Sequence, residues 1–181
     1  MFKTTPDKGC ILVIGGAKSG KSRVSLDMAD GLIKKKLFLA TARGLDEEMQ
    51  QRIARHKKER GLDWETVEEP LRIADRICEL DRADTVILVD CLTLWLNNLF
   101  MRQGKFLEPL HRSVDELIAA LTGVKGVIIL VSNEVGMGIV PENELARAYR
   151  DMAGSLNQRI ASMARKVVAI MAGIPVVIKD E

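Results

Sequence analysis

The fold is decided by the stretch Ile11-Leu12-Val13-Ile14-Gly15-Gly16-Ala17-Lys18-Ser19-Gly20-Lys21-Ser22. Its apolar start is typical of a buried β-strand, and the strand leads directly into glycine, four residues and then Gly-Lys-Ser. In such a loop the backbone N–H groups and the N-terminus of the following helix converge on one anionic site. The order of strand, glycine-rich loop and helix therefore predicts a site for the phosphates of a nucleoside triphosphate.

Residues of this loop have separate expected roles. Gly15, Gly16 and Gly20 are predicted where the backbone bends and a Cβ would clash. Lys21 can reach the β- and γ-phosphates, and the Ser22 hydroxyl can serve as a ligand of Mg²⁺. The structural alternative is a glycine-rich turn with a chance lysine. Apolar residues at helical spacing after the loop argue against that alternative: Val24, Met28 and Leu32.

Length and composition predict a single globular domain with a substantial core. The chain has 181 residues, of which 47% are hydrophobic and 29% are charged. A net charge of +2 argues against a dedicated nucleic-acid-binding protein, which usually carries a strong basic excess. The three cysteines cannot all pair within the chain and show no zinc-binding spacing, so reduced thiols in a cytoplasmic protein are expected.

The N-terminal residues predict neither secretion nor membrane anchoring. Residues 1–8 contain no apolar core of their own, and the apolar run from Cys10 to Gly16 is too short to span a membrane. Residues 1–10 precede the first expected strand, which starts at Ile11, and are interpreted as an N-terminal extension. Residues 11–181 are interpreted as one catalytic domain.

Short apolar runs alternate with helical patterns, which predicts an α/β fold with a mainly parallel sheet. The expected strands are Ile11–Ile14, Leu37–Ala40, Thr85–Val89, Val127–Ser132, Val167–Met171 and Pro175–Lys179. The last run follows its predecessor too closely for a parallel crossover, so it is predicted to be antiparallel. Helices are predicted from apolar stripes that begin at Ile73, Leu110 and Leu145.

A second phosphate signal is Asp90, which ends the apolar run from Thr85 to Val89. In proteins with a phosphate-binding loop, such an aspartate lies beside the loop and helps to hold Mg²⁺. Alone, it could be a plain strand end. The next run, 91–98, is too apolar for an exposed surface, so it is expected to pack in the core or to form the wall of an apolar substrate site.

His56 lies on a predicted basic helix and has two interpretations. Met49, Ile53 and His56 share one helix face by their spacing, so the histidine could simply finish an apolar stripe. From spacing alone this structural interpretation is favoured. The alternative is a nucleophile whose imidazole is kept neutral by neighbouring cations. The other histidine, His111, follows Pro109 near a helix start and is expected on the surface.

Several segments together resemble one family. They are GGAKSGKS, LATA, DEEMQQRIARHKKER, DWETVEEP, ILVDCLTLWLNN and NEVGMGIVPENELARAYRDMAGSLNQRIA. They are similar to the bifunctional adenosylcobinamide kinase/adenosylcobinamide-phosphate guanylyltransferase family from about Ile11 to the C-terminus. The segment 133–161 is the most specific of them, because its features are not general to proteins with a phosphate-binding loop.

The resemblance implies a cytoplasmic enzyme of cobalamin biosynthesis with a RecA-like P-loop fold, usually a homotrimer. Such an enzyme phosphorylates adenosylcobinamide with ATP or GTP and then transfers GMP from GTP to the adenosylcobinamide phosphate. The second step runs through a guanylylated histidine, which here falls on His56. The resemblance thus reverses the interpretation from spacing, and it leaves Lys21 and His56 as the candidate catalytic residues.

By the same motifs, the resemblance implies a set of nucleotide contacts: Gly15, Gly16, Ala17, Lys18, Ser19, Gly20, Lys21, Ser22, Ala40, Thr41, Ala42, Lys57, Lys58, Glu59, Arg60, Glu68 and Asp90. The resemblance implies that Ser22 and Asp90 hold Mg²⁺. A carboxylate at Glu68 would suit the two donors of a guanine edge, although an exposed loop acid is the alternative. Lys18 departs from the arginine that the family more often has there, and Arg55 replaces a second histidine found in some members.

Two other functions fit the phosphate-binding loop. One is a small-molecule kinase without nucleotidyl transfer, which would form no covalent GMP adduct. The other is a nucleotide-dependent regulatory module on a RecA-like scaffold, which would have a protein partner and no turnover with cobinamide.

Overall fold

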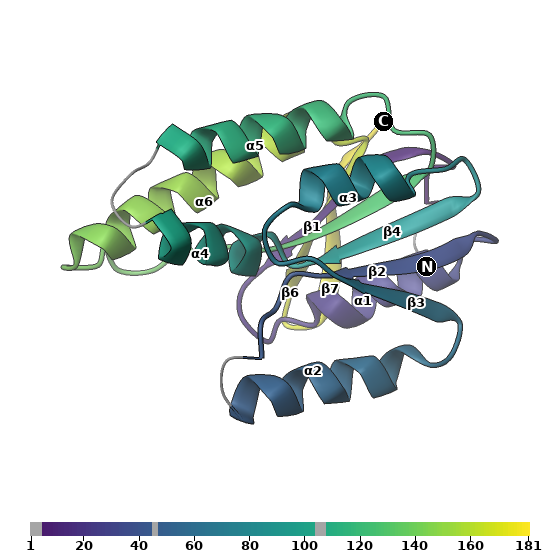
Figure 1. The fold of residues 1–181 in the computed structure, drawn as a ribbon, viewed down its shortest axis with the longest axis horizontal. Helices are drawn as coiled ribbons and strands as arrows, with labels where there is room; N and C mark the ends of the chain where they lie inside the picture. The colour runs from purple at the N-terminus through teal and green to yellow at the C-terminus, as the bar shows by residue number, and fades with distance from the viewer. Residues whose placement is uncertain (1–4, 45–46, 104–107) are drawn as a thin grey trace.

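A computed structural model describes residues 5–44, 47–103 and 108–181. Thirteen elements follow one another in the order β1 (Gly9–Gly15), α1 (Lys21–Asp30), β2 (Lys35–Ala40), α2 (Glu47–Arg60), β3 (Trp64–Glu68), α3 (Ile73–Leu80), β4 (Thr85–Asp90), α4 (Leu92–Gln103), α5 (Glu108–Leu121), β5 (Val127–Asn133), α6 (Glu144–Met163), β6 (Lys166–Met171) and β7 (Ile174–Asp180). The alternation of strand and helix confirms the predicted α/β class (Figure 1).

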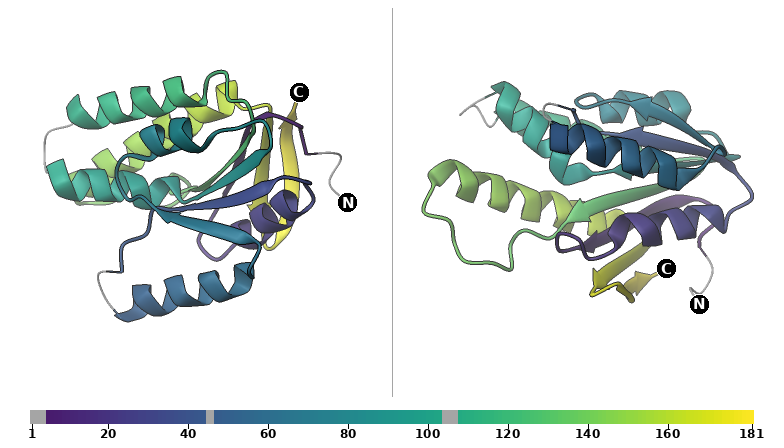
Figure 2. Two further views of the ribbon diagram at one scale, coloured as in Figure 1. Left: turned by 45° about the vertical axis from the view of Figure 1, so that its right-hand side comes forward. Right: turned by 90° about the horizontal axis from the view of Figure 1, so that it is seen from below.

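The strands form one sheet in the order β3-β2-β4-β5-β1-β6-β7. All neighbouring pairs are parallel except β6 and β7, which are antiparallel as predicted. Helices α3, α4, α5 and α6 cover one face, and α1 and α2 lie on the other side (Figures 1 and 2). Parallel strands carry their loops to one shared edge, so the carboxyl ends of β1, β2, β3, β4 and β5 lie together there.

The centre of the sheet is apolar on both faces. Residues 86–89 of β4 and 127–130 of β5 are fully buried, as expected for parallel strands with helices on both sides. This double coverage explains why these strands appear in the sequence as unbroken apolar runs.

Each predicted strand is present, and each is one to three residues longer than predicted. Strand β1 begins at Gly9, whose N–H donates to the carbonyl of Gly126, so Cys10 is buried within the sheet. The boundary between an N-terminal extension and a catalytic domain remains a prediction. One strand, β3, was not predicted, because Glu65 and Glu68 interrupt its apolar residues and it lies at the sheet edge. Leu32 falls after the end of α1 rather than within it.

The C-terminal hairpin is fastened to the loop that follows β1. Ala172 and Gly173 form its turn and have φ values of 50° and 81°, as a tight hairpin turn requires. The N–H of Gly173 donates to the carbonyl of Ser19 at 2.9 Å. Beyond this turn β7 is mostly exposed, and it presents apolar side chains at Ile174, Val176 and Ile178.

No helix within the described ranges is both long and apolar enough to cross a membrane.

Asp81 joins the end of α3 to the start of β5. Its side chain is buried, and its two oxygens accept the N–H groups of Lys125 at 2.7 Å and Gly126 at 2.8 Å. A Cβ at Gly126 would lie 2.3 Å from the carbonyl oxygen of Arg82, so the chain has no space for a larger residue there. Asp81 therefore holds a crowded entry into the central strand.

We predict that Asp81→Asn lowers the free energy of unfolding by about 2 kcal/mol, because one buried backbone N–H would face an amide N–H₂ instead of an oxygen. The midpoint of urea denaturation measures this loss. Asp84→Asn is the matched control, since Asp84 is exposed and its replacement should change the free energy by less than about 0.5 kcal/mol. Equal shifts in the two variants would contradict the role given to Asp81.

Candidate active site

The loop between β1 and α1 has little space at its first glycine. A Cβ at Gly15 would lie 2.4 Å from the carbonyl oxygen of Ile170 and 2.9 Å from Ser19 Oγ. Gly20 has a φ of +99°, a conformation that favours glycine. At Gly16 the expected clash is absent, because a Cβ there would meet no described atom within 4 Å. The steric reason for glycine thus holds at Gly15 but not at Gly16, and Gly20 is required by its conformation.

The loop residues between Gly16 and Gly20 differ in their exposure. Ala17 and Lys18 are exposed, and Lys18 adopts a positive φ of 54° although it is not glycine. Ser19 Oγ is buried, and it makes no hydrogen bond within the part of the chain that the structure describes. Its hydroxyl is therefore suited to a hydrogen bond with a bound anion.

Lys21, Ser22 and Asp90 meet at the start of α1. Lys21 is buried and its Nζ donates to the Gly16 carbonyl at 2.6 Å. Ser22 Oγ donates to Asp90 Oδ2 at 2.9 Å, although 68 positions separate the two residues. The meeting follows from the sheet order, since β5 alone lies between β4 and β1. The structure brings the predicted strand-end carboxylate beside the loop.

The residues at this meeting point fit a magnesium ion in their chemistry. A hydroxyl and a carboxylate are oxygen ligands, and Mg²⁺ in phosphate sites takes one or two such ligands and completes its shell with phosphates and water. Among the described residues, no group of three or more histidine, cysteine or acidic side chains could form a metal cage. The pair of Ser22 and Asp90 is thus suited to a metal that arrives with a nucleotide.

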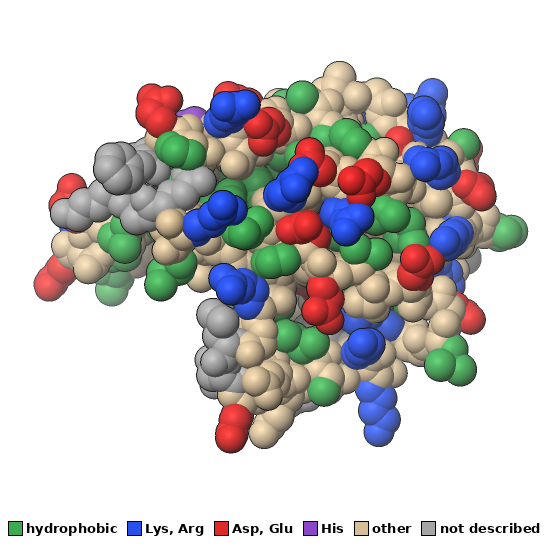
Figure 3. Space-filling view, in the orientation of Figure 1, with side chains coloured by type: hydrophobic (Ala, Val, Ile, Leu, Met, Phe, Trp, Pro, Cys, Tyr) green, Lys and Arg blue, Asp and Glu red, His purple; other side chains and the backbone are tan. Residues whose placement is uncertain are grey.

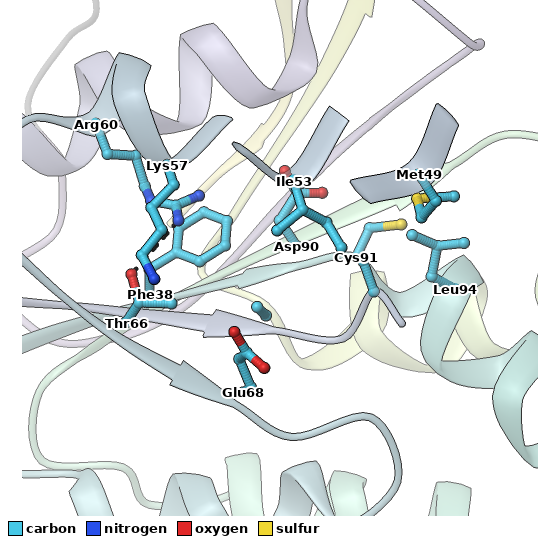
Figure 4. A pocket seen from close by; sticks show the side chains of 12 residues that line it. Phe38, Met49, Ile53, Lys57, Arg60, Thr66, Glu68, Asp90, Cys91 and Leu94 are labelled. Carbon is cyan, nitrogen blue, oxygen red and sulfur yellow. Dashed lines mark hydrogen bonds between the residues drawn. The ribbon is translucent and has the colours of Figure 1, made fainter. Parts of the chain in front are cut away.

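A cleft lies between α2 and the carboxyl ends of β2, β3 and β4 (Figure 4). We call it the α2 cleft, and its lining residues are Phe38, Ala40, Ala42, Met49, Ile53, Lys57, Arg60, Thr66, Glu68, Asp90, Cys91 and Leu94. It contains several of the residues predicted to contact a nucleotide: Ala40, Ala42, Lys57, Arg60, Glu68 and Asp90.

Sequence reasoning missed the aromatic wall of this cleft. Phe38 lies two residues before Ala40 on β2, and alternation along a strand places both on one face. The guanidinium of Arg60 lies 3.6 Å from the centroid of the Phe38 ring, and Trp64 packs edge-on against the same ring. The two-residue period of a strand, counted back from the predicted contact Ala40, is the sequence signal that indicates Phe38.

Arg60 connects the α2 cleft to the loop. Together with Phe38 and Asp90, it also lines a second pocket that contains Ser22 and Arg23. Arg60 Nη2 donates to Thr66 Oγ1 at 3.4 Å, but its buried Nε makes no hydrogen bond to any described residue. Burial lowers the pKa of Arg60, whereas the Asp90 carboxylate raises it. A guanidinium remains charged at neutral pH, so a cation lies between the two pockets.

Thr41 is placed differently from its neighbours Ala40 and Ala42. It is fully buried, and its hydroxyl donates to the Cys91 carbonyl at 2.8 Å while accepting the Cys91 N–H at 2.7 Å. The amide of Asn98 donates to the Thr41 carbonyl at 2.8 Å. Thr41 thus holds the ends of β2 and β4 together, and its hydroxyl is already paired within the protein.

Helix α2 carries His56 over the α2 cleft. The backbone of His56 lies three residues after Ile53 and directly before Lys57, both of which line the cleft. The side chains of His56 and Glu59 lie outside the described residues, so their contacts remain predictions. Lys58 is exposed and is not among the residues that line the cleft. His111 is exposed on α5, as expected.

Cys91 also lines the cleft but is unsuited to be a nucleophile. Burial and the neighbouring Asp90 carboxylate raise the pKa of its thiol, which is hydrogen bonded with Thr93 Oγ1 at 3.1 Å. The thiolate is the reactive form, so a raised pKa leaves this group inert at neutral pH. Most of the run that follows packs in the core, with Trp95 and Leu96 buried.

Sequence comparisons connect the chain to enzymes of one kind. A family described as cobinamide kinase / cobinamide phosphate guanyltransferase matches residues 11–178. The bifunctional adenosylcobalamin biosynthesis protein CobP of Pseudomonas aeruginosa is 42% identical, over 94% of this chain and 97% of its own length. The protein CobU of Salmonella typhimurium, which has the same description, is 42% identical over 93% of this chain and 99% of its own length.

Solved structures with low sequence identity confirm the fold. The flagellar accessory protein FlaH of Methanocaldococcus jannaschii aligns with a TM-score of 0.53 and 17% identity, covering 96% of this chain and 79% of FlaH. The RadB recombinase aligns with a TM-score of 0.50 and 14% identity, covering 89% of this chain and 73% of RadB. This likeness agrees with the RecA-like P-loop fold predicted above. On the nearly full-length match of its sequence, the chain belongs to the cobinamide kinase / cobinamide phosphate guanyltransferase family.

Proposed function

We propose that this protein catalyses two successive transfers to adenosylcobinamide. It first phosphorylates the cobinamide hydroxyl with ATP or GTP, and it then attaches GMP from GTP to give adenosylcobinamide-GDP and pyrophosphate. The observation that carries the proposal is that the α2 cleft and the pocket that contains Ser22, the last residue of the phosphate-binding loop, share Arg60, Phe38 and Asp90 as a common wall. A triphosphate on the loop would thus border directly on the helix that carries His56.

The kinase step needs positioning and charge neutralisation more than covalent help. The hydroxyl oxygen of cobinamide attacks the γ-phosphorus and its proton is released to water, while the bond to the β–γ bridging oxygen breaks and the nucleoside diphosphate leaves with that electron pair. Lys21 is the cation held at the loop, and in this structure its ammonium donates to the Gly16 carbonyl. We propose that β- and γ-phosphate oxygens take up its hydrogen bonds when a nucleotide binds.

Ser22 and Asp90 are the residues that would hold Mg²⁺. When bound, the ion would neutralise part of the phosphate charge. Asp90 already accepts the Ser22 hydroxyl at 2.9 Å, which aligns both oxygens at the start of α1. Hydrogen bonds to the loop N–H groups would hold the remaining phosphate oxygens.

The guanylyl transfer is proposed to run through His56. Its neutral imidazole attacks the α-phosphorus of GTP, the bond to the α–β bridging oxygen breaks, and pyrophosphate leaves. A phosphate oxygen of the cobinamide phosphate then attacks the same phosphorus, the P–N bond breaks, and the imidazole is released. Arg60 is the partly unpaired cation at the shared wall, which suits it to the developing charge on the leaving pyrophosphate.

Guanine recognition is proposed at Glu68, the last residue of β3. Its side chain points into the α2 cleft from the strand end (Figure 4). The N1–H and exocyclic amine of guanine are both donors, and a carboxylate can accept both hydrogen bonds. Adenine lacks this pair of donors, so Glu68 would favour GTP in the second step.

A homotrimer and a cytoplasmic location remain predictions from the family resemblance. The exposed apolar residues of β7 support contact between copies of the chain, since an open strand edge with such side chains suits an interface.

His56→Ala should abolish the covalent GMP adduct, because no other group is proposed to attack the α-phosphorus. The measurement is incubation with α-labelled GTP and magnesium, followed by denaturation and detection of an acid-labile label. His111→Ala is the matched control, since it removes the other histidine of the chain from an exposed position. Equal labelling of His56→Ala and wild type would show that another residue carries GMP.

Lys21→Met should lower kcat of the kinase step at least about 100-fold, because a fixed charge that faces the transferred phosphoryl group is lost. Transfer of label from γ-labelled ATP to cobinamide measures the rate, and a urea titration checks that the variant is folded. Lys125→Met serves as the control, since Lys125 is exposed at the opposite end of the sheet. A kinase rate within twofold of wild type would contradict the role of Lys21.

Glu68→Gln should raise the KM for GTP in adduct formation about tenfold, since a charge-assisted hydrogen bond would become a neutral one with a mismatched donor. The KM for ATP in the kinase step should stay unchanged. Glu65→Gln is the control on the same strand, where the carboxylate pairs with Lys35 at 2.8 Å. The assignment fails if Glu65→Gln and Glu68→Gln raise the KM for GTP equally.

A further inference from the structure

A groove outside the α2 cleft lies between α4, α6 and the loop that follows β5. We call it the α4–α6 groove. Phe100 and Tyr149 form its buried side, where their rings pack edge to face with centroids 5.5 Å apart. Val135, Ile139 and Leu145 add apolar surface from the loop and from the start of α6. None of the residues predicted to contact a nucleotide lines this groove.

A chain of hydrogen bonds connects the inner end of the groove to Gly15, at the start of the phosphate-binding loop. Tyr149 donates from its hydroxyl to the Thr93 carbonyl at 2.8 Å, and Asn133 Nδ2 donates to Thr93 Oγ1 at 2.7 Å. Asn133 is the strand partner of Gly15, and the N–H of Glu134 donates to the Gly15 carbonyl at 3.0 Å. The chain segment that starts at Asn133, the strand partner of Gly15, thus continues as a wall of the groove.

The groove is unusually apolar for an open surface. Ile139 is 97% exposed, Met101 is 75% exposed and Leu145 is 49% exposed. Green side chains gather at the α4 and α6 end of the molecule in the space-filling view (Figure 3). Such a contiguous patch beside a functional site indicates a surface that is covered by a ligand or a partner.

The wall of the groove is held in shape. Arg147 Nη1 donates to the carbonyls of Pro141 at 3.0 Å and Glu142 at 2.6 Å, and Asn143 Oδ1 accepts the Ala146 N–H at 3.0 Å to cap α6. At its other end the wall is fixed by the bond from Glu134 to Gly15. A preformed concave surface of this kind loses little entropy on binding, which is typical of a small-molecule site.

Polar groups complete the groove. Asn97 and Asn143 line it with amides, and Arg150 lines it with a guanidinium whose nearest ion pair, to Asp151, is long at 3.8 Å. Amides and a guanidinium can bind carboxamide side chains, while the apolar lining can cover a ring system. The combination suits a large amphipathic molecule better than a nucleotide.

We propose that the α4–α6 groove binds the alcohol acceptor of the kinase step, an amphipathic corrin macrocycle with amide side chains. The inference rests on the proposed function and adds the site of its second substrate. A macrocycle in the groove lies against the segment that is hydrogen bonded to Gly15, so its hydroxyl arm extends toward the phosphate-binding loop. A second copy of the chain has another suitable surface, the open edge of β7.

Two variants, Ile139→Asp and Leu145→Asp, test the proposal by placing a charge on the apolar wall. We expect each to raise the KM for cobinamide in the kinase step at least tenfold. Equilibrium dialysis of cobinamide, measured by its visible absorbance with a non-hydrolysable ATP analogue present, should show the same loss of affinity. The GMP adduct formed from GTP alone uses no acceptor, so its rate should match that of wild type.

Ile33→Asp is the matched control, because it places the same charge on an exposed apolar residue of the turn between α1 and β2. It should leave the KM and the dialysis result unchanged. The proposal is overturned if both groove variants bind cobinamide as wild type does, or if Ile33→Asp weakens binding equally. It is also overturned if the groove variants change the mass of the assembly in light scattering, since the groove would then be a contact between copies.

The dialysis also separates this proposal from the proposed function. If wild-type protein binds cobinamide, the groove variants do not, and neither phosphorylates it, the proposed function is overturned and the groove proposal is supported. Normal turnover in both groove variants would overturn the groove alone.

Discussion

The parallel pairing of β5 with both β1 and β4 is the constraint on which the rest of the site depends. It fixes Gly15 opposite Asn133 and Asp90 opposite Val131, so the loop and the Asp90 carboxylate lie one strand apart. The hydrogen bond from Ser22 to Asp90 is possible only at this separation. Because β4 and β5 are buried on both faces, the pairing is held by the apolar core rather than by the polar site.

Features that arise from local chain chemistry could be predicted from the sequence. The loop from Gly15 to Ser22 has a fixed spacing of glycine and lysine, because the backbone N–H groups themselves form such an anion site. The residue pattern alone therefore predicts the conformation of the loop. Asp90 ends an apolar run, and the parallel order of such runs places strand ends together. The antiparallel C-terminal pair was also predictable, because the short connection between β6 and β7 permits no crossover.

Features that arise from contacts across the chain could not be predicted from it. The stack of Arg60 on Phe38 joins a helix end to a strand, and neither position alone indicates it. Thr41 matched a nucleotide-binding motif, yet its hydroxyl makes hydrogen bonds with the backbone of Cys91. This pairing between two distant segments is evident only from the structure. Strand β3 was not predicted because an edge strand with one exposed face tolerates acidic residues, and these interrupt the apolar pattern of a strand. For His56 the family resemblance, not the helix period, supported the catalytic interpretation.

The bond between the hairpin turn and the loop has a consequence for assembly. Gly173 holds the Ser19 carbonyl, and the strand that begins one residue later is the open, apolar edge of the sheet. A protein surface that pairs with β7 and a triphosphate that orders Ser19 would act on the two sides of one turn. Two ligands that stabilise the same local structure favour each other's binding by equal free energies. With the proposed oligomer and the proposed nucleotide site, subunit association and nucleotide occupancy would be linked equilibria.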